Sequence, residues 1–449
     1  MTGTRRIWMV GACLVSVVLA LSTGSAATPA ALRCVDPDRP LIADHSVRQA
    51  PPLAEPPPRT PFRDPVFGTC LVRVTDRAAD IAAGDASRGL KNEYSRVQAF
   101  NADESLLLIM GLAATWYVYD AATLQPIRKL APEGPIEPRW HARDPGVLFY
   151  IDATRLTSLE VHSGRQLTVR DFAADFPGQR LAAVWSRHEG SPSLDGRYWG
   201  LMAEDENWLP VAFMIYDRDH DRIAAIRDMR GVPGIEQDVD HVTISPRGTY
   251  FAAALDRYCE RGQTGSDARP CGLMVYDGNL ANGRSLARIM GHYDLALDAE
   301  GREVIVYQDI DTDHIAMIDL ASGQRTELQG IDFSATGNPT LGLHISGRAT
   351  ARPGWALVST YDDTAGSRTW MDDQVFAIEL KPGGRIARLA HTRALVEPAK
   401  EHDYWAEPHA TVNRDFTRVL FTTNWGRSGS EAIDTMAIEL PPAWPAQLR

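Results

Sequence analysis

Short apolar runs separated by polar turns recur along the chain from about residue 66 onward, as in SLLLI (105–109), VLFY (147–150) and VIVY (304–307). Their length and their β-branched and aromatic content predict strands. No long apolar stripe of helical period accompanies them. The pattern therefore predicts an all-β protein.

Seven segments share one order of elements: a polar or aromatic start, a short apolar run, a polar turn, and β-rich runs that end in a Tyr-Asp or Ile-Asp type turn. Their starts are about 52 residues apart on average, close to the length of a four-stranded propeller blade. The sequence thus predicts one seven-bladed β-propeller over residues 66–449. The segments start near Tyr94, Glu137, Arg187, Asp240, Gly291, Gly342 and Glu407.

The two ends of the repeat array complement each other. The last segment lacks an outer strand after Leu440, whereas residues 69–75 (TCLVRVT) form a spare strand before the first segment. If this N-terminal strand pairs with the last blade, it covers an edge that would otherwise be open. We therefore expect the N-terminal strand to close the ring.

The N-terminus has the pattern of an export signal. Arg5 and Arg6 precede an apolar run from Ile7 to Leu21, and small residues follow up to Ala27. At about 15 residues this run is short for a membrane span. We therefore predict a signal peptide over residues 1–27 and a periplasmic or secreted chain without a membrane span.

Residues 28–65, with seven prolines between positions 51 and 65, are predicted to form an extended arm.

Four cysteines remain after cleavage of this signal, as expected for disulfides in an exported chain. Their spacing favours Cys259 with Cys271 and Cys34 with Cys70. No CxxC spacing occurs, which argues against a thiolate zinc site.

The net charge and the type of basic residue limit the classes of ligand that the chain could bind. The 449 residues carry a formal charge of −12, which argues against a nucleic-acid surface. Only four of the 46 basic residues are lysines, so a cation that binds a ligand would be an arginine. Codon bias in a GC-rich genome explains the same excess equally well. One closed propeller accounts for the length, and we expect it to act as a monomer.

Histidines recur where the innermost strand of each blade would start. In a propeller these positions converge on one mouth of the central channel. Such convergence implies a metal site, an acid/base site or both, although channel mouths are also lined by structural polar groups. The converging residues include Tyr94, Arg96, His188, His241, His292, His344, Glu407 and His409.

Aromatic and basic residues near these positions suggest a carbohydrate ligand. Trp405 lies before and Trp425 after the start of the last segment at Glu407, and aromatic rings stack on sugars. Arg348 would bind an acidic group if it faces the channel. We therefore assign substrate binding to His292, Arg348, Trp405 and Trp425.

Four tracts give the chain a resemblance to a known group: NEYSRVQAFNADES, EPRWHARDP, HISGRATARPGWALVSTY and EPHATVNRDFTRVLFTTNWG. Together they resemble exported propeller proteins grouped around oligogalacturonate lyases and ulvan lyases. The resemblance spans most of residues 90–430 as a pattern, but only these tracts are specific.

The resemblance implies β-elimination on a uronate-containing glycan, that is, an acidic polysaccharide or oligosaccharide. It implies a metal site at His344, Glu407 and His409, holding one divalent metal (Mn or Ca), or no cofactor at all. Glu407 stands where the lyase motif Q-x-x-H-x-H has a histidine, and the preceding glutamine is absent. By analogy of role rather than by motif, His188, His241, Tyr94 and Arg96 are the candidate catalytic residues.

Two hypotheses follow. In the first, the chain is a polysaccharide lyase, or a related carbohydrate enzyme, that uses His or Tyr for proton transfer and a cation to stabilise the enolate-like charge. In the second, the chain is a non-catalytic propeller that binds a glycan or a protein partner.

Overall fold

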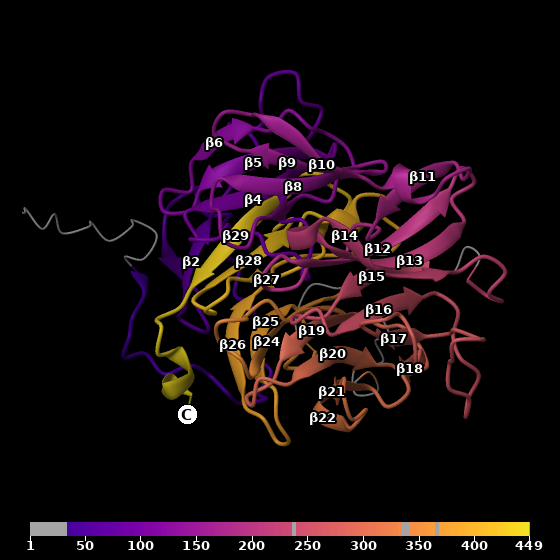
Figure 1. Ribbon diagram of the computed structural model, residues 1–449. Helices are drawn as coiled ribbons and strands as arrows, with labels where there is room; N and C mark the ends of the chain where they lie inside the picture. Colours follow the sequence, from indigo (N-terminus) through magenta and orange to yellow (C-terminus); the bar gives the residue numbers. More distant parts are fainter. Residues whose placement is uncertain (1–33, 236–238, 332, 334–340, 364–367, 449) are drawn as a thin grey trace, which may run out of the picture.

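Seven antiparallel sheets follow one another around a central axis in the computed structural model, which describes residues 34–235, 239–331, 333, 341–363 and 368–448 (Figure 1). No α-helix occurs within these ranges. The predicted seven-bladed β-propeller is thereby confirmed. None of the helices in the described residues is long and apolar enough to cross a membrane. The predicted signal peptide, residues 1–27, lies outside the described part of the chain.

Blades 1 to 3 are meanders in which each strand pairs with the next along the chain. Blade 1 contains β3 (Leu90–Lys91), β4 (Leu106–Gly111), β5 (Thr115–Asp120) and β6 (Pro126–Lys129). Blade 2 contains β7 (Arg139–Trp140), β8 (Val147–Asp152), β9 (Arg155–Glu160) and β10 (Gln166–Asp171). Blade 3 contains β11 (Leu181–Trp185), β12 (Tyr198–Asp205), β13 (Pro210–Asp217) and β14 (Arg222–Asp228).

Blades 4 to 6 repeat this order. Blade 4 contains β15 (Val239–Ile244), β16 (Tyr250–Leu255), β17 (Leu273–Asp277) and β18 (Arg284–Ala287). Blade 5 contains β19 (Tyr293–Leu297), β20 (Glu303–Asp309), β21 (His314–Asp319) and β22 (Arg325–Gly330). Blade 6 contains β23 (Gly342–Ser346), β24 (Trp355–Tyr361), β25 (Gln374–Glu379) and β26 (Ile386–His391).

Blade 7 joins the two ends of the chain. Its strands β27 (Thr411–Val412), β28 (Arg418–Thr423) and β29 (Asp434–Glu439) are completed by β2 (Cys70–Arg73) and β1 (Phe62–Arg63). β2 pairs with β29 in antiparallel register, with Val72 opposite Ala437. The predicted closure by the N-terminal strand is therefore observed. Short 3-10 turns lie at η2 (Phe172–Asp175), η3 (Arg218–His220), η4 (Asp403–Ala406) and η5 (Trp444–Gln447).

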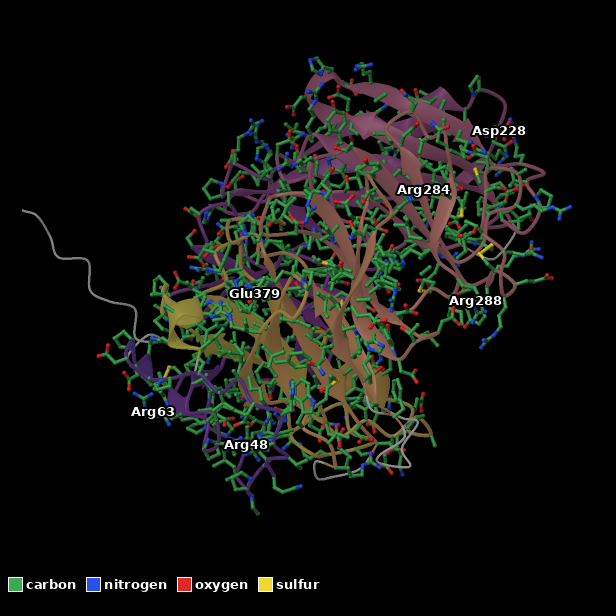
Figure 2. All side chains as sticks on the ribbon, turned by 90° about the horizontal axis from the view of Figure 1, so that it is seen from below. Arg48, Arg63, Asp228, Arg284, Arg288 and Glu379 are labelled. Carbon is green, nitrogen blue, oxygen red and sulfur yellow. A yellow bond between two sulfur atoms is a disulfide. The ribbon has the colours of Figure 1, made fainter. Side chains whose placement is uncertain are left out.

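Apolar side chains fill the seams between neighbouring blades. Among the described residues, each of the seven seams has its own buried cluster, such as Phe213, Phe251 and Tyr276 between blades 3 and 4. Charged side chains such as Arg48, Asp228 and Arg288 lie around the periphery (Figure 2). The stability of the ring therefore comes from the seams, and the channel is left to polar residues.

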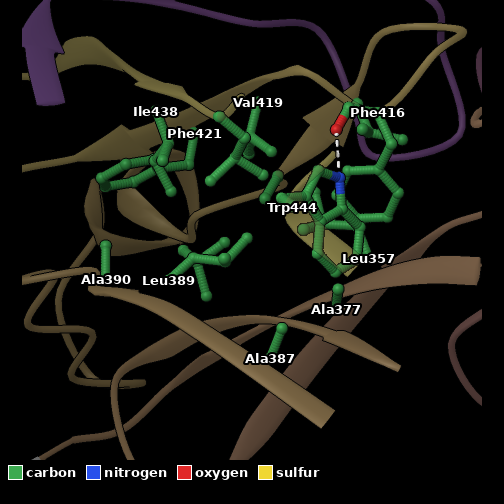
Figure 3. Packing of buried hydrophobic residues seen from close by; sticks show 14 of the residues in the cluster. Leu357, Ala377, Ala387, Leu389, Ala390, Phe416, Val419, Phe421, Ile438 and Trp444 are labelled. Atoms are coloured by element: carbon green, nitrogen blue, oxygen red, sulfur yellow. Dashed lines mark hydrogen bonds between the residues drawn. The ribbon is translucent and has the colours of Figure 1, made fainter. Parts of the chain in front are cut away.

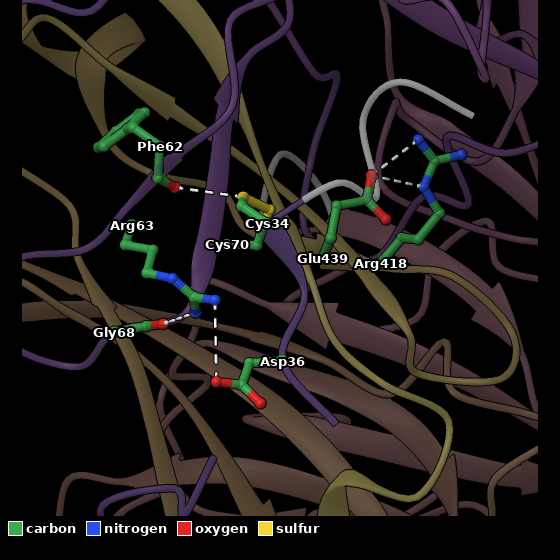
Figure 4. The surroundings of a disulfide bond; sticks show 8 residues. All are labelled: Cys34, Asp36, Phe62, Arg63, Gly68, Cys70, Arg418 and Glu439. Carbon is green, nitrogen blue, oxygen red and sulfur yellow. Dashed lines mark hydrogen bonds and ion pairs between the residues drawn. A yellow bond between two sulfur atoms is a disulfide. The ribbon is translucent and has the colours of Figure 1, made fainter. Parts of the chain in front are cut away.

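The arm before β1 runs along blades 6 and 7. The predicted disulfides are both present, and Cys34–Cys70 ties the start of the described arm to β2 (Figure 4). Further along, the buried Arg388 of β26 donates from Nη1 to the Ser46 carbonyl at 2.6 Å. Trp425 donates from Nε1 to the Leu53 carbonyl at 3.0 Å. The arm is thus hydrogen-bonded to both blades.

Trp444 of η5 anchors the C-terminal end under the seam of blades 6 and 7 (Figure 3). Its ring is fully buried, 4.7 Å from Trp355 and 5.1 Å from Phe416 between centroids. Its Nε1 donates to the Phe416 carbonyl at 2.7 Å.

We expect Trp444→Ala to lower the free energy of unfolding by about 3–5 kcal/mol, because it opens a cavity in this cluster. Trp444→Phe keeps most of the packing and loses the hydrogen bond, so its loss should be about 1–2 kcal/mol. Denaturant unfolding of both variants measures the difference. A loss below 1 kcal/mol for the alanine variant would contradict this role.

Candidate functional site

Backbone strain gathers at one end of the channel, which we call the site mouth. Non-glycine residues with left-handed backbone there include Ala114 (φ 56°), Glu137 (φ 48°), Arg187 (φ 62°), His188 (φ 76°) and His409 (φ 42°). This conformation costs such a residue about 1–2 kcal/mol. Observed strain of this kind is typical of functional sites, where surrounding contacts enforce it.

The inner strands of blades 1 and 3 are interrupted at the site mouth. In blade 1, pairing with β4 stops after Lys91 and resumes at the bridge between Phe100 and Leu107. In blade 3, β11 ends at Trp185, and the chain continues irregularly. Tyr94 and Arg187, each predicted to lie at the start of a segment, therefore come after an inner strand and do not begin one. Irregular backbone frees these side chains from the sheet pleat and lets them reach the axis.

His344, Glu407 and His409 meet at the centre of the site. His344 lies on β23, and the other two immediately precede β27. His344 Nε2 is 2.7 Å from Glu407 Oε2, and His409 Nε2 is 3.6 Å from the same oxygen. One ligand atom from each residue lies within 4.8 Å of the others. The ring of His292 packs beside this group, 4.5 Å from His344 between centroids.

The chemistry of these side chains suits a divalent metal. Burial lowers the pKa of His344 and of His409 well below 6.5, so both imidazoles are neutral and offer lone pairs. His409 Nε2 is a buried atom without a hydrogen-bond partner among the described residues. Two imidazole nitrogens and a carboxylate oxygen form a donor set for metals such as manganese and zinc, whereas calcium prefers oxygen. The residues present therefore fit a metal ion.

A second polar network surrounds Arg96. Its guanidinium forms an ion pair with Glu189, and its Nη1 lies 2.6 Å from His241 Nε2. The Tyr293 hydroxyl is 2.7 Å from the same nitrogen, while His241 Nδ1 is 2.8 Å from Asp240 Oδ2. Glu189, Asp240 and His241 are close enough to form a metal-binding group, but the Arg96 guanidinium already contacts Glu189 and His241.

A pocket of about 350 Å³ opens at the site mouth. Tyr94 lies on its floor, with its ring 4.8 Å from that of His409 and 5.3 Å from the Arg96 guanidinium. The pocket lining combines apolar and aromatic side chains with charged and polar ones, and Lys91 Nζ lies 5.3 Å from the ring centre of Trp405. The apolar and aromatic residues include Met110, Leu112, Trp116, Tyr404 and Trp405, and the charged and polar ones include Lys91, Glu93, Glu137, Arg187, His188, Glu189 and Asp240.

The carboxylates that line the pocket are already engaged. Glu93 forms a bidentate ion pair with Arg139 at 2.9 and 3.0 Å, although burial still raises the pKa of Glu93 to about 7. Glu137 accepts hydrogen bonds from the Ser186 backbone and hydroxyl and from the His188 backbone. These internal pairings neutralise or satisfy the acids.

Most of the predicted site residues meet at this mouth. Six of them lie around the channel axis together with Glu407, and His188 and Trp405 line the pocket above. The six are Tyr94, Arg96, His241, His292, His344 and His409.

Arg348 and Trp425 lie elsewhere. Arg348 is at the opposite mouth, where it forms a buried ion pair with Asp294 at 2.8 Å. Trp425 binds the arm, and Arg393 packs over its ring.

Sequence reasoning missed several residues of the site. Lys91 lies 3.2 Å from His409 Nδ1, and burial lowers its pKa to about 8. It is one of only four lysines in the chain, a signal that could have drawn attention to it. Asp240 and Tyr293 each adjoin a predicted histidine in sequence. Glu93, Glu137 and Tyr361 all lie in the tracts that carry the resemblance, and Glu137 starts the second segment, but their residue types alone did not point to a role in the site.

Comparison with known proteins supports the fold. Two solved structures align along nearly their whole length: an oligogalacturonate lyase in complex with manganese, at 14% identity, and an oligogalacturonate lyase from Vibrio parahaemolyticus, at 11%. The alignments cover 89% and 90% of this chain and 99% of each lyase, both with a TM-score of 0.57. The chain has the fold of these lyases. No protein-family model and no curated protein matches its sequence.

Burial makes Glu407 costly to ionise. Although His292, Tyr361 and Lys91 favour its charged form, burial outweighs them and raises the pKa of Glu407 from 4.5 to about 7. The folded chain therefore holds this proton more tightly than the unfolded chain, and stability is lost as pH rises from about 4.5 to about 7.

We expect Glu407→Gln to raise the free energy of unfolding at pH 8 by about 2–3 kcal/mol, because the amide cannot ionise. At pH 5 the effect should nearly vanish, since the wild-type carboxyl is then protonated. Denaturant unfolding of chelator-treated protein at both pH values measures this. An equal effect at pH 5 and pH 8 would contradict the assignment.

Proposed function

We propose that this protein is a carbohydrate-active propeller that cleaves uronate-containing glycan by β-elimination. One observation carries the proposal: a pocket lined by aromatic side chains and by His188 and Tyr94 adjoins, through the Tyr94 ring, a buried metal-type group and a fixed arginine. The fold shared with two oligogalacturonate lyases supports it. The predicted export signal is consistent with an extracellular or periplasmic glycan.

In this reaction a base takes the proton from C5 of the uronate, the C4–O4 bond breaks, and an acid protonates the departing oxygen. His188 is suited to act as the base, because it lines the pocket and burial lowers its pKa below 6.5, leaving the ring neutral at pH 7. Tyr94 is suited to act as the acid, because burial raises its pKa well above 10 and keeps its hydroxyl protonated.

Arg96 is itself buried and packs against the Tyr94 ring, so it would act from behind that ring on the negative charge that develops on the uronate carboxylate. It is held in place by Glu189 and His241, and its Nε donates to the Tyr293 carbonyl at 2.5 Å. His241 is fully buried, so its part is to orient this guanidinium and not to touch substrate. A divalent ion held by His344, Glu407 and His409 would supply further positive charge when bound. The two nitrogen ligands favour manganese over calcium for that site.

A non-catalytic glycan-binding propeller is the second candidate. The charge of the mouth favours it, because four carboxylates line the pocket beside only two cations, Lys91 and Arg187. Binding of oligosaccharide without any turnover, with or without added metal, would support this candidate.

We expect wild-type protein to release unsaturated uronate from at least one of a panel of uronic polysaccharides, followed by the absorbance of the new double bond. His188→Ala and Tyr94→Phe should each lower kcat by about 10²–10⁴-fold, as loss of a general base or acid does. His162→Ala removes an exposed histidine from an outer turn of blade 2 and should leave kcat unchanged. Absence of the absorbance change on every substrate, with and without divalent metal, would refute the lyase assignment.

We expect one equivalent of divalent metal per chain after incubation with Mn²⁺ and removal of the excess. His409→Ala and Glu407→Gln each remove one of three ligands and should abolish this stoichiometric binding. His314→Ala alters a histidine on β21, the third strand of blade 5, and is the matched control. Elemental analysis of the four proteins gives the result. Metal retained by His409→Ala would place the ion elsewhere.

A further inference from the structure

An exposed tryptophan stands beside the site mouth in an unfavourable backbone conformation. Trp208, in the turn between β12 and β13, has φ 62° and a relative exposure of 54%. A bulky residue at positive φ is a genuine outlier, because glycine or asparagine normally occupies such turn positions. The fold therefore keeps a large apolar ring in solvent where a glycine would be less strained.

The turn is rigid. Asp205 Oδ1 accepts hydrogen bonds from the backbone of Asn207 at 2.8 Å and of Leu209 at 3.1 Å. The Trp208 backbone donates to the Asp205 carbonyl at 2.9 Å. β12 and β13 hold eight residues each, which makes them the longest strands of the described chain. The turn therefore presents Trp208 at a fixed position.

Trp208 is the outer member of an aromatic pair. Its ring lies 5.6 Å from that of Trp185, at an interplanar angle of 44°. Trp185 is half-buried against the core of blades 2 and 3, and its Nε1 donates to the buried Glu204 at 2.7 Å. The indole N–H is thus already satisfied, and the ring is locked.

The pair continues directly into the pocket. Trp185 packs edge-on against His188, with 4.9 Å between ring centroids, and His188 lines the pocket. Arg187, the neighbour of His188, also lines it. Arg187 Nη1 bonds to the Val239 carbonyl, and its nearest carboxylate among the described residues is Glu204, at 3.9 Å. An aromatic surface thus adjoins a guanidinium without a close ion pair.

We infer that Trp208 and Trp185, with Arg187, form an outer sugar-binding subsite on blade 3. Its ligand is a uronate residue of a chain whose cleaved bond lies in the pocket. The rings stack on the apolar face of the pyranose, and the guanidinium binds its carboxylate. The inference rests on the proposed function for its ligand class and adds that the protein prefers longer chains over dimers.

The test is binding of oligogalacturonides of two and six residues, followed by tryptophan fluorescence and calorimetry. The Tyr94→Phe background prevents turnover. We expect the hexamer to bind about tenfold more tightly than the dimer. Trp208→Gly should weaken hexamer binding about tenfold and leave dimer binding unchanged. It should not lower the free energy of unfolding, because glycine is favoured at this φ. Ile226→Ala, on the exposed outer strand β14 of the same blade, is the control and should change neither affinity.

Equal affinity for the two chain lengths, equal effects of Trp208→Gly on both, or no binding of either would overturn the inference. The proposed function fails separately. Length-dependent binding without elimination by wild-type protein refutes the lyase assignment and keeps the subsite. Elimination without length-dependent binding refutes the subsite and keeps the lyase assignment.

Discussion

Pairing between β2 and β29 closes the ring, and at the seam of blades 7 and 1 the Thr435 hydroxyl of β29 donates to the Leu90 carbonyl of β3. Arg73 of β2 forms an ion pair with the buried Asp434 of β29 at 2.9 Å. On the inner side of the same seam, Lys91 lies 3.2 Å from His409 Nδ1, and Asn92 donates to the His409 carbonyl at 2.6 Å. The metal-type group is thus built on a blade whose position depends on closure. An open ring would leave β29 as a free edge and would separate Tyr94 from the histidines.

Stability and chemistry are divided between different parts of each blade. The seams hold the apolar clusters, while the site mouth holds left-handed backbone, buried carboxyls and a histidine nitrogen without a partner. Each of these features opposes folding by itself. They persist because the inner strands that carry them are fixed by seams on both sides. Gly190 shows how closely neighbouring blades pack at the channel: a Cβ there would lie 2.3 Å from the Val242 carbonyl of blade 4.

The fold could be read from the sequence because a blade is a local unit with a regular length, and the missing outer strand at one end matched a spare strand at the other. The histidines near the start of the inner strands could be recognised for the same reason, because they recur at one position of this unit. Arg348 shows the limit of this reasoning. It follows His344 by four residues, and four strand residues span about 13 Å, so the inner strand carries Arg348 toward the opposite mouth. The contacts of Glu93 and Glu137 arise from irregular backbone, which has no period to read, and Lys91 ends the two-residue strand β3 just before such a stretch.

Acidic residues also line the site mouth, yet the way they are paired there is compatible with an acidic ligand. Glu189 is paired with Arg96, Glu93 with Arg139, and Asp240 with His241. The two arginine pairs fix Arg96 and Arg139 and leave little net charge on these groups, so the attraction for a uronate must come from the remaining cations. Lys91 and Arg187 supply part of it. Glu407 contacts His344 and His409 and has no arginine or lysine ion pair among the described residues, and burial raises its pKa to about 7. A dication at this residue would both favour its ionised form and make the pocket positive, so metal binding and recognition of an acidic sugar would be linked through one carboxylate.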